Sequence, residues 1–268
     1  MKAAGFLGCL GVEAFKLRRT MALALAILLP AAPVAVFLFY ILQKGRAELS
    51  DSLNPTSMIV LGLVGLWAIF VLPVFAAIET SLLAALEHQN RGWKHLFALP
   101  PARGSLLAAK FAAAVLLVTI AHAFLFGYTL VLLWVAPKLQ PGVGLDGPIP
   151  VVATLASVAV CAASSLFMVG VHALIALRWP SFALNVGIAL GGLLFALGML
   201  DSRLGRFFPW SLPAVAHKIA VPWIFGLPGW PGGPAGPRSL AVVLLISAAG
   251  LLVTAVGGCW VLSRRDVF

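Results

Sequence analysis

Six long runs of apolar residues divide the chain, and the stretches between them carry nearly all of its charged residues. A bilayer core about 30 Å thick is crossed by about 20 helical residues that rise 1.5 Å each. Each run is close to that length or longer, and a single acidic residue, Glu79, interrupts the second. The predicted spans are residues 21–42, 58–86, 111–135, 151–177, 182–200 and 240–262.

These spans predict an all-α integral membrane protein with one transmembrane domain over residues 1–268. Inside hydrocarbon a helix satisfies its own backbone hydrogen bonds, whereas an open strand does not. The first run resembles a signal peptide, because basic residues precede it, but its 22 apolar residues exceed the apolar region of such a peptide. We therefore expect it to be retained as the first span.

Two shorter helices are predicted beside the spans. Residues 5–20 alternate apolar and charged positions at helical spacing, which favours an N-terminal helix lying in the membrane interface. Residues 211–224 follow Pro-rich sequence, and Pro213 suits a first helical turn, so we expect a short outer helix between spans five and six. Three tryptophans of this region favour the membrane interface. They are Trp210, Trp223 and Trp230.

The segment 87–104 after the second span is polar at its start, then amphipathic, and is ended by Pro100 and Pro101. This pattern predicts a short helix across one mouth of the bundle. Trp93 would anchor it, while its charged residues would be exposed to a partner. Those charged residues are Glu87, Arg91 and Lys94.

The basic residues of the connections set the orientation. With a cytoplasmic N-terminus, the inside segments hold ten Lys and Arg in 48 residues, and the outside segments hold seven in 69. Because cytoplasmic loops are enriched in Lys and Arg, both termini are expected in the cytoplasm, in an inner-type cell membrane.

Composition excludes several classes of function. Charged residues make up 10% of the chain, and its formal net charge of +10 is spread over short clusters, so the basicity indicates membrane topology rather than nucleic-acid binding. The dipeptide Gly-Lys never occurs, which excludes a P-loop in this chain. Cys9, Cys161 and Cys259 lie far apart, so neither a disulfide framework nor a zinc site is predicted. We expect no catalytic residues, no metal and no cofactor here.

Polar residues within the spans are candidates for a transport pathway, because their burial in lipid is costly. Glu79 and His172 are the two that would line a substrate path or relay protons. For Glu79, contact with interfacial water or an ion pair with Lys110 is the alternative. The other polar positions are His122, Ser164, Ser165 and Asn185.

This layout resembles the permease subunits of ABC-2 type exporters, in particular the branch associated with lantibiotic and bacitracin immunity. The resemblance covers the whole chain, from the basic N-terminal helix through the six spans to the outer helix. Its most specific part is the segment Glu87-His-Gln-Asn-Arg-Gly-Trp-Lys-His-Leu-Phe-Ala-Leu-Pro-Pro-Ala-Arg103, followed by Lys110. Phe-Pro-Trp-Ser-Leu-Pro at 208–213 and the Arg264-Arg-Asp266 ending are similar too.

The resemblance implies a half-transporter. Two such permeases, identical or paralogous, would pair in the membrane with two cytoplasmic P-loop ATPase subunits that hold ATP and Mg²⁺. The segment after the second span would dock on the ATPase, and the cargo would be a peptide antibiotic or another amphipathic molecule. The residues that would couple the permease to the ATPase are Glu87, Arg91, Gly92, Trp93 and Lys94.

Two other classes of protein stay open from the residues alone. An ion-coupled carrier would use Glu79 or His172 as its relay, but it would be expected to show paired halves, and no internal repeat is evident. A membrane enzyme or assembly factor acting without an ATPase would gather polar residues at one depth of the spans, whereas this chain scatters them.

Overall fold

The computed structural model describes residues 5–18, 20–44, 55–88, 97–98, 102–141, 145, 147–227 and 237–264. These residues form helices joined by turns, with no strand among them. The elements are α1 (Phe6–Leu17), α2 (Met21–Leu28), α3 (Ala31–Lys44), α4 (Pro55–Leu66), the π-helical η2 (Trp67–Val71), α5 (Leu72–His88), α7 (Arg103–Leu139), α8 (Val151–Ser164), α9 (Leu166–Arg178), α10 (Phe182–Met199), the 3-10 turn η4 (Arg203–Arg206), α11 (Leu212–Phe225) and α12 (Pro237–Ser263).

The helices are long and apolar enough to form a membrane bundle. Within the described residues, five helical stretches could each cross a membrane, and α8 with α9 makes a sixth if the bent pair is one span. The all-α membrane architecture that the sequence predicts is thus confirmed.

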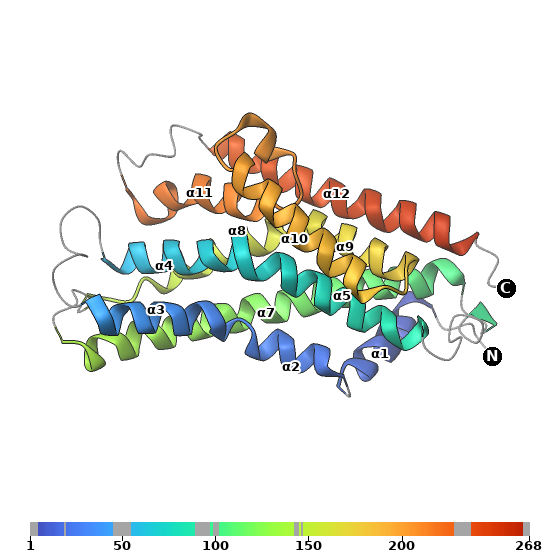
Figure 1. The fold of residues 1–268 in the computed structure, drawn as a ribbon, viewed down its shortest axis with the longest axis horizontal. Coiled ribbons are helices and arrows are strands. Elements are labelled where there is room, and N and C mark those ends of the chain that lie inside the picture. Colours follow the sequence, from blue (N-terminus) through green and yellow to red (C-terminus); the bar gives the residue numbers. More distant parts are fainter. Residues whose placement is uncertain are drawn as a thin grey trace.

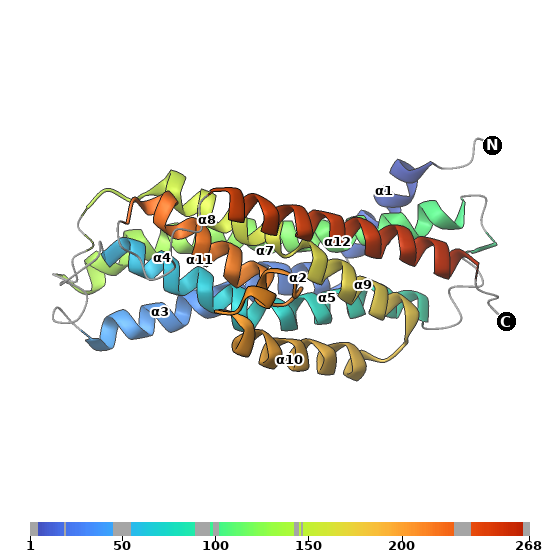
Figure 2. The same ribbon diagram turned by 90° about the horizontal axis from the view of Figure 1, so that it is seen from above.

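Both termini of the bundle lie at one end, together with α1, the end of α5 and the turn between α9 and α10 (Figure 1). We call this the terminal end. The start of α4, the end of α7 and the last turns of α11 lie at the opposite end (Figure 1). Seen from above, α10 forms one edge of the bundle, beside α5 and α9 (Figure 2).

The third span begins earlier than the apolar pattern indicates. We expected it at residue 111, after the charged Lys110, but α7 runs for 37 residues from Arg103 to Leu139. Lys110 is inside this helix because its ammonium group has carboxylate partners, so its charge does not have to end the buried stretch. At 1.5 Å per residue, α7 is about 55 Å long, which exceeds the thickness of a bilayer core.

The fourth span is bent rather than straight. We expected one helix over residues 151–177, whereas α8 and α9 meet at an angle of 41°. The Ser164 hydroxyl donates to the carbonyl of Val160 at 2.6 Å, and the Ser165 hydroxyl donates to that of Ala162 at 2.7 Å. Serine hydroxyls that bond back to the preceding turn bend helices, so these two polar residues have a local structural use.

Proline residues explain two other irregularities. Pro73 has no backbone N–H to donate to the preceding turn, and the π-helical turn η2 lies immediately before it, where the N–H of Leu72 bonds to Trp67 one residue further back than in an α-helix. Pro30 lies in the turn that separates α2 from α3. The first span (α2 and α3) and the second span (α4, η2 and α5) therefore remain continuous, although the helix geometry changes locally in each.

The region between α10 and α12 folds back onto the bundle. α11 begins after Ser211 and ends at Gly226, whose φ of 62° is a left-handed conformation that favours glycine. Trp223 is exposed, whereas Trp210 is buried against the bundle. Trp210 therefore packs inside the bundle instead of presenting its ring to the surroundings, and Trp230 lies outside the described residues.

Trp210 packs directly onto the backbone of α10 at Gly192. A β-carbon at Gly192 would overlap the indole ring, whereas one at Gly187 on the same helix would meet no neighbouring atom within 4 Å. Close packing thus requires a glycine at the first position and not at the second.

Replacing Gly192 with alanine should lower thermal stability in detergent, because the Trp210 ring must shift to admit the new methyl group. We expect a cost of about 1–3 kcal/mol, typical of overpacking a well-packed interior. Thermal unfolding followed by size-exclusion chromatography measures it, with Gly187→Ala as the control that should leave stability unchanged. Equal behaviour of the two variants would contradict this packing.

Candidate functional site

A closed ring of four charged side chains ties together three helices at the terminal end. Lys16 of α1 donates to Glu13 Oε1 at 2.9 Å and to Glu87 Oε1 at 2.8 Å. Lys110 of α7 donates to Glu13 Oε2 at 3.0 Å, and its ammonium nitrogen lies 2.8 Å from Glu87 Oε2 as an ion pair. Each carboxylate thus gives one oxygen to each lysine. We call this group the charge ring.

The charge ring is electrically neutral and largely withdrawn from solvent. Glu13, Glu87 and Lys110 are buried, and only Lys16 is partly exposed. Buried charges persist only when they are paired and hydrogen-bonded, and loss of one member leaves an uncompensated charge behind. The ring therefore fixes the end of α5 and the start of α7 to the N-terminal helix α1.

The sequence of α1 explains why its charges point inward. Glu13 and Lys16 are three residues apart, so they share one face of the helix. The opposite face is apolar and outward, with Leu7 79%, Val12 55% and Phe15 57% exposed. A helix at a membrane surface gains by turning such a face toward lipid, which leaves its charges to find partners in the bundle.

Lys16 remains protonated through the physiological pH range. Burial by itself lowers its pKa, but hydrogen bonds to Glu87 and Glu13 outweigh this, so its pKa is raised above the usual 10.5. A raised lysine pKa stabilises the fold at pH values below 10.5, and that contribution is lost only as the pH rises through the pKa of the folded state. The Lys16 contacts are thus constant near neutral pH.

A second polar network lies within the bundle, between α5, α9 and α10. Asn185 accepts a hydrogen bond from His172 Nδ1 at 2.8 Å, and its amide nitrogen lies 2.9–3.0 Å from Ala77 O, Thr80 Oγ1 and Ser81 Oγ. Trp210 donates to His172 Nε2 at 3.1 Å. Both ring nitrogens of His172 are occupied, so this conformation leaves neither for a substrate or a transferable proton.

Two further buried histidines also join helices. His122 of α7 accepts from the Trp67 indole at 3.1 Å, and its Nδ1 donates to the carbonyl of Val118 at 2.8 Å. His217 of α11 lies 3.1 Å from the Ser157 hydroxyl and donates to a carbonyl of α4 at 3.2 Å. These rings are structural connections between helices.

Glu79 is the one carboxylate within the described spans that lies buried without any hydrogen-bond partner; the Thr154 hydroxyl of α8 is a neutral group that also has none. The Glu79 side chain is 1% exposed, and neither of its carboxylate oxygens has a hydrogen-bond partner in the described part of the chain. The suggested ion pair with Lys110 is wrong, because Lys110 contacts Glu13 and Glu87 instead. A buried polar group left unpaired in a native fold calls for a functional explanation.

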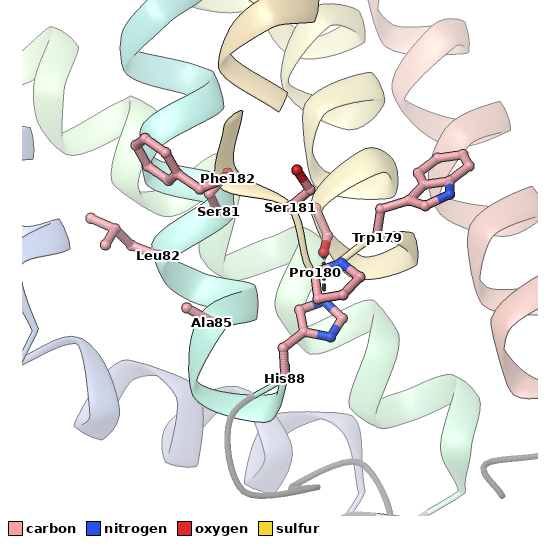
Figure 3. Close-up of a pocket in the computed structure, with 9 residues that line it drawn as sticks. Ser81, Leu82, Ala85, His88, Trp179, Pro180, Ser181 and Phe182 are labelled. Carbon is pink, nitrogen blue, oxygen red and sulfur yellow. Dashed lines mark hydrogen bonds between the residues drawn. The ribbon is translucent and has the colours of Figure 1, made fainter. Parts of the chain in front are cut away.

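The described part of the chain also contains a pocket of about 270 Å³ at the terminal end, between α5 and the α9–α10 turn (Figure 3). Its polar members are Ser81, Ser181 and His88, whose Nε2 donates to the carbonyl of Ala176 at 2.8 Å. The other lining residues are Leu82, Ala85, Ala176, Trp179, Pro180 and Phe182.

Comparison with known families decides the class of this membrane protein. The family described as ABC-2 family transporter protein matches residues 9–195, which include the charge ring, the pocket and the Asn185 network apart from Trp210. No curated protein and no solved structure matches the chain. The chain belongs to the ABC-2 transporter family.

The protein is therefore the membrane-spanning subunit of an ABC transporter, and not the ATPase itself. Permeases of this kind work with an ATPase partner. The family match favours a permease over the carrier and the ATPase-independent enzyme that the sequence left open.

Only one of the expected coupling residues of the permease belongs to the described part of the structure. Glu87 lies in the last turn of α5, whereas Arg91, Gly92, Trp93 and Lys94 lie outside the described residues. We expected Glu87 to be exposed to a partner, but the charge ring buries it. Glu87 is therefore a link between the polar segment and the bundle rather than part of an exposed surface.

Sequence reasoning missed the charge ring of the permease, although it singled out Glu87 and Lys110 separately. Glu87 and Lys16 are 71 residues apart, and Lys110 and Glu13 are 97 apart, so no helical spacing relates them. One usable signal is electroneutrality. An acidic residue at the end of an otherwise apolar helix needs a cation, and Lys110, directly before the predicted third span, is one of the basic residues at a span margin.

Replacing Lys110 with methionine should destabilise the permease strongly, because Glu13 and Glu87 would each lose a buried cation. Breaking a buried pair costs about 3–5 kcal/mol, whereas an exposed pair contributes about 0–1 kcal/mol. The matched control is Lys218→Met, which breaks the exposed pair with Asp201. Thermal unfolding in mild detergent measures both, and a Lys110→Met variant as stable as the control would contradict the ring.

Proposed function

We propose that the permease is one half of an ATP-driven exporter and that the segment 87–104 docks on a separate cytoplasmic ATPase. The observation that carries this proposal is the position of Glu87, which begins that segment and also belongs to the charge ring. A movement of the segment would pull on α1 and α7 through the ring. Packed elements with discrete arrangements transmit motion in this way.

The coupling residues in this proposal are Arg91, Gly92, Trp93 and Lys94, with Glu87 connecting them to the bundle. A second permease, identical or paralogous, completes the membrane part. The ATPase subunits supply ATP and Mg²⁺, and this chain contributes no catalytic group. The charge ring has to keep its geometry in this proposal. If its ion pairs separated, a movement of the segment 87–104 would not displace α7.

The terminal end faces the cytoplasm in this proposal, and the membrane is the inner cell membrane. The denser Lys and Arg of the connections at this end support the orientation. The outward apolar face of α1 supports a position in the lipid interface, where Phe15 and Leu7 enter the acyl boundary.

The cargo in this proposal is an amphipathic molecule, such as a peptide antibiotic. The apolar spans support it, since a membrane-dissolved substrate needs few specific polar contacts. The resemblance to lantibiotic and bacitracin immunity permeases supports a peptide in particular. Growth of cells with and without the transporter, across a panel of antimicrobial peptides, tests this choice.

Weakening the docking segment should release the ATPase without unfolding the permease. The variant Trp93→Ala/Lys94→Glu removes one aromatic anchor and reverses one charge, and we expect co-purification of the ATPase to fall by about tenfold or more. The matched control is Trp134→Ala, which removes an exposed tryptophan at the opposite end of α7. Unchanged co-purification and transport in the segment variant would remove the docking assignment.

Two residues were expected on the transport pathway, and we propose that role for Glu79 alone. The hydrogen bonds of His172 support a structural role instead. Glu79→Gln preserves shape and removes the charge, so stability should be unchanged or slightly higher. We expect normal assembly with the ATPase and a loss of transport. Vesicle transport with purified components measures this, and wild-type transport would show that Glu79 is not on the pathway.

A further inference from the structure

The end of the segment 87–104 is held against α1 and α7. The guanidinium carbon of Arg103 lies 4.9 Å from the centroid of the Phe97 ring, which is the distance of a cation–π contact. Phe97 in turn packs against an apolar cluster that joins α1 to the first turns of α7. The members of this cluster are Cys9, Leu106 and Ala109. The described residues near the end of the segment therefore pack as one unit with the start of α7.

The same guanidinium also reaches the last span. Its Nη1 donates a hydrogen bond to the carbonyl of Ser263, the last residue of α12, at 3.1 Å. The last carbonyls of a helix have no partner within the helix and carry partial negative charge, so a cation is favoured there. Arg103 itself stands in the first turn of α7, where the helix dipole disfavours a cation. Its charge is therefore better placed at the end of α12 than within its own helix.

Further contacts hold the end of α12 against the start of α7. The Cys259 thiol donates to the carbonyl of Gly104 at 3.9 Å. Cys259 and Ser263 are four residues apart, so both lie on the face of α12 that is turned toward α7. A β-carbon at Gly258 would lie 3.0 Å from the Phe111 ring of α7. The two helix ends lie side by side in both views (Figures 1 and 2).

The charge ring does not include α12. Its four members belong to α1, α5 and α7, so a movement passed on by the ring reaches those helices first. α12 packs along α9, and β-carbons at Gly170 of α9 and Gly250 of α12 would overlap Thr254 and Phe167 of the facing helix. A movement that reaches the end of α12 is therefore shared with α9.

We propose that Arg103 is a second coupling residue of the permease, which transmits movement of the segment 87–104 to α12. The inference rests on the proposed docking of that segment on an ATPase. Glu87 connects the start of the segment to α1 and α7, whereas Arg103 connects its end to α12 and, through α12, to α9. The role of Arg103 is to position α12.

Replacement of the Arg103 contact by a removable covalent link tests this role. The variant Arg103→Cys/Ser263→Cys lacks the guanidinium, and a bis-methanethiosulfonate reagent as long as the arginine side chain then joins the two cysteines reversibly. Ser263→Cys alone, treated with the same reagent, is one control, because Arg103 binds the backbone carbonyl of Ser263 and not its hydroxyl. Arg264→Gln is the control for charge, since Arg264 lies over the Trp260 ring of its own helix.

Co-purification of the ATPase and transport into vesicles are measured for each variant. We expect the double-cysteine variant to bind the ATPase like the wild type but to transport at least about fivefold less, and both controls to transport normally. The link should restore transport, and reduction of the link should remove that gain. Because Arg103 is exposed, the variant should fold; if it does not, Arg103→Gln decides by the same two measurements.

Three results would overturn the role of Arg103 while leaving the docking of the segment intact. They are wild-type transport without the link, transport that stays low although the link has formed, and loss of the ATPase from the variant, which would place Arg103 in the docking surface. A wild-type permease that binds no ATPase would instead refute the proposed function, and the role of Arg103 with it.

Discussion

A charge that is buried at a membrane surface must be neutralised by an opposite charge in direct contact. This constraint determines how the helices pack at the terminal end of the permease. Two carboxylates and two ammonium groups satisfy it because each carboxylate places one oxygen against each ammonium group, with N–O distances of 2.8–3.0 Å. The geometry leaves little freedom, because moving α1, α5 or α7 separately would separate at least one pair of charges. The three helices therefore behave as one unit at Glu87, where the polar segment 87–104 begins.

The interior of the bundle follows a different rule, in which polar side chains are neutral and hydrogen-bonded. Asn185, His172 and Trp210 connect α5, α9 and α10 to the segment before α11, and His122 and His217 make equivalent links elsewhere. Such networks specify one packing of helices that apolar contacts alone would leave less defined. Glu79 differs because it is an ionisable group to which no described group bonds, whereas Thr154, also without a partner, is neutral, and this is why Glu79 remains the candidate for transport.

Much of the architecture could be predicted, because the length of an apolar run is a direct physical requirement of the bilayer. The start of α7 was misplaced because Lys110 was treated as the end of a buried stretch, whereas its partners come from residues 13 and 87. The bend at Ser164 and Ser165 was missed because hydroxyl bonds to the preceding turn leave no trace in hydropathy. The spacing of residues along one helix does not reveal ion pairs between residues that are far apart in the sequence.

Motion from the proposed docking segment 87–104 would reach α1 and α7 through the charge ring. The double variant Glu87→Gln/Lys110→Met tests it most directly, since it removes one charge of each sign and leaves the Glu13–Lys16 pair intact. ATP hydrolysis and transport are measured together in vesicles, with Asp201→Asn/Lys218→Met as the exposed-pair control. We expect a folded complex that still binds its ATPase and hydrolyses ATP but transports about tenfold less. Transport equal to that of the wild type would contradict it.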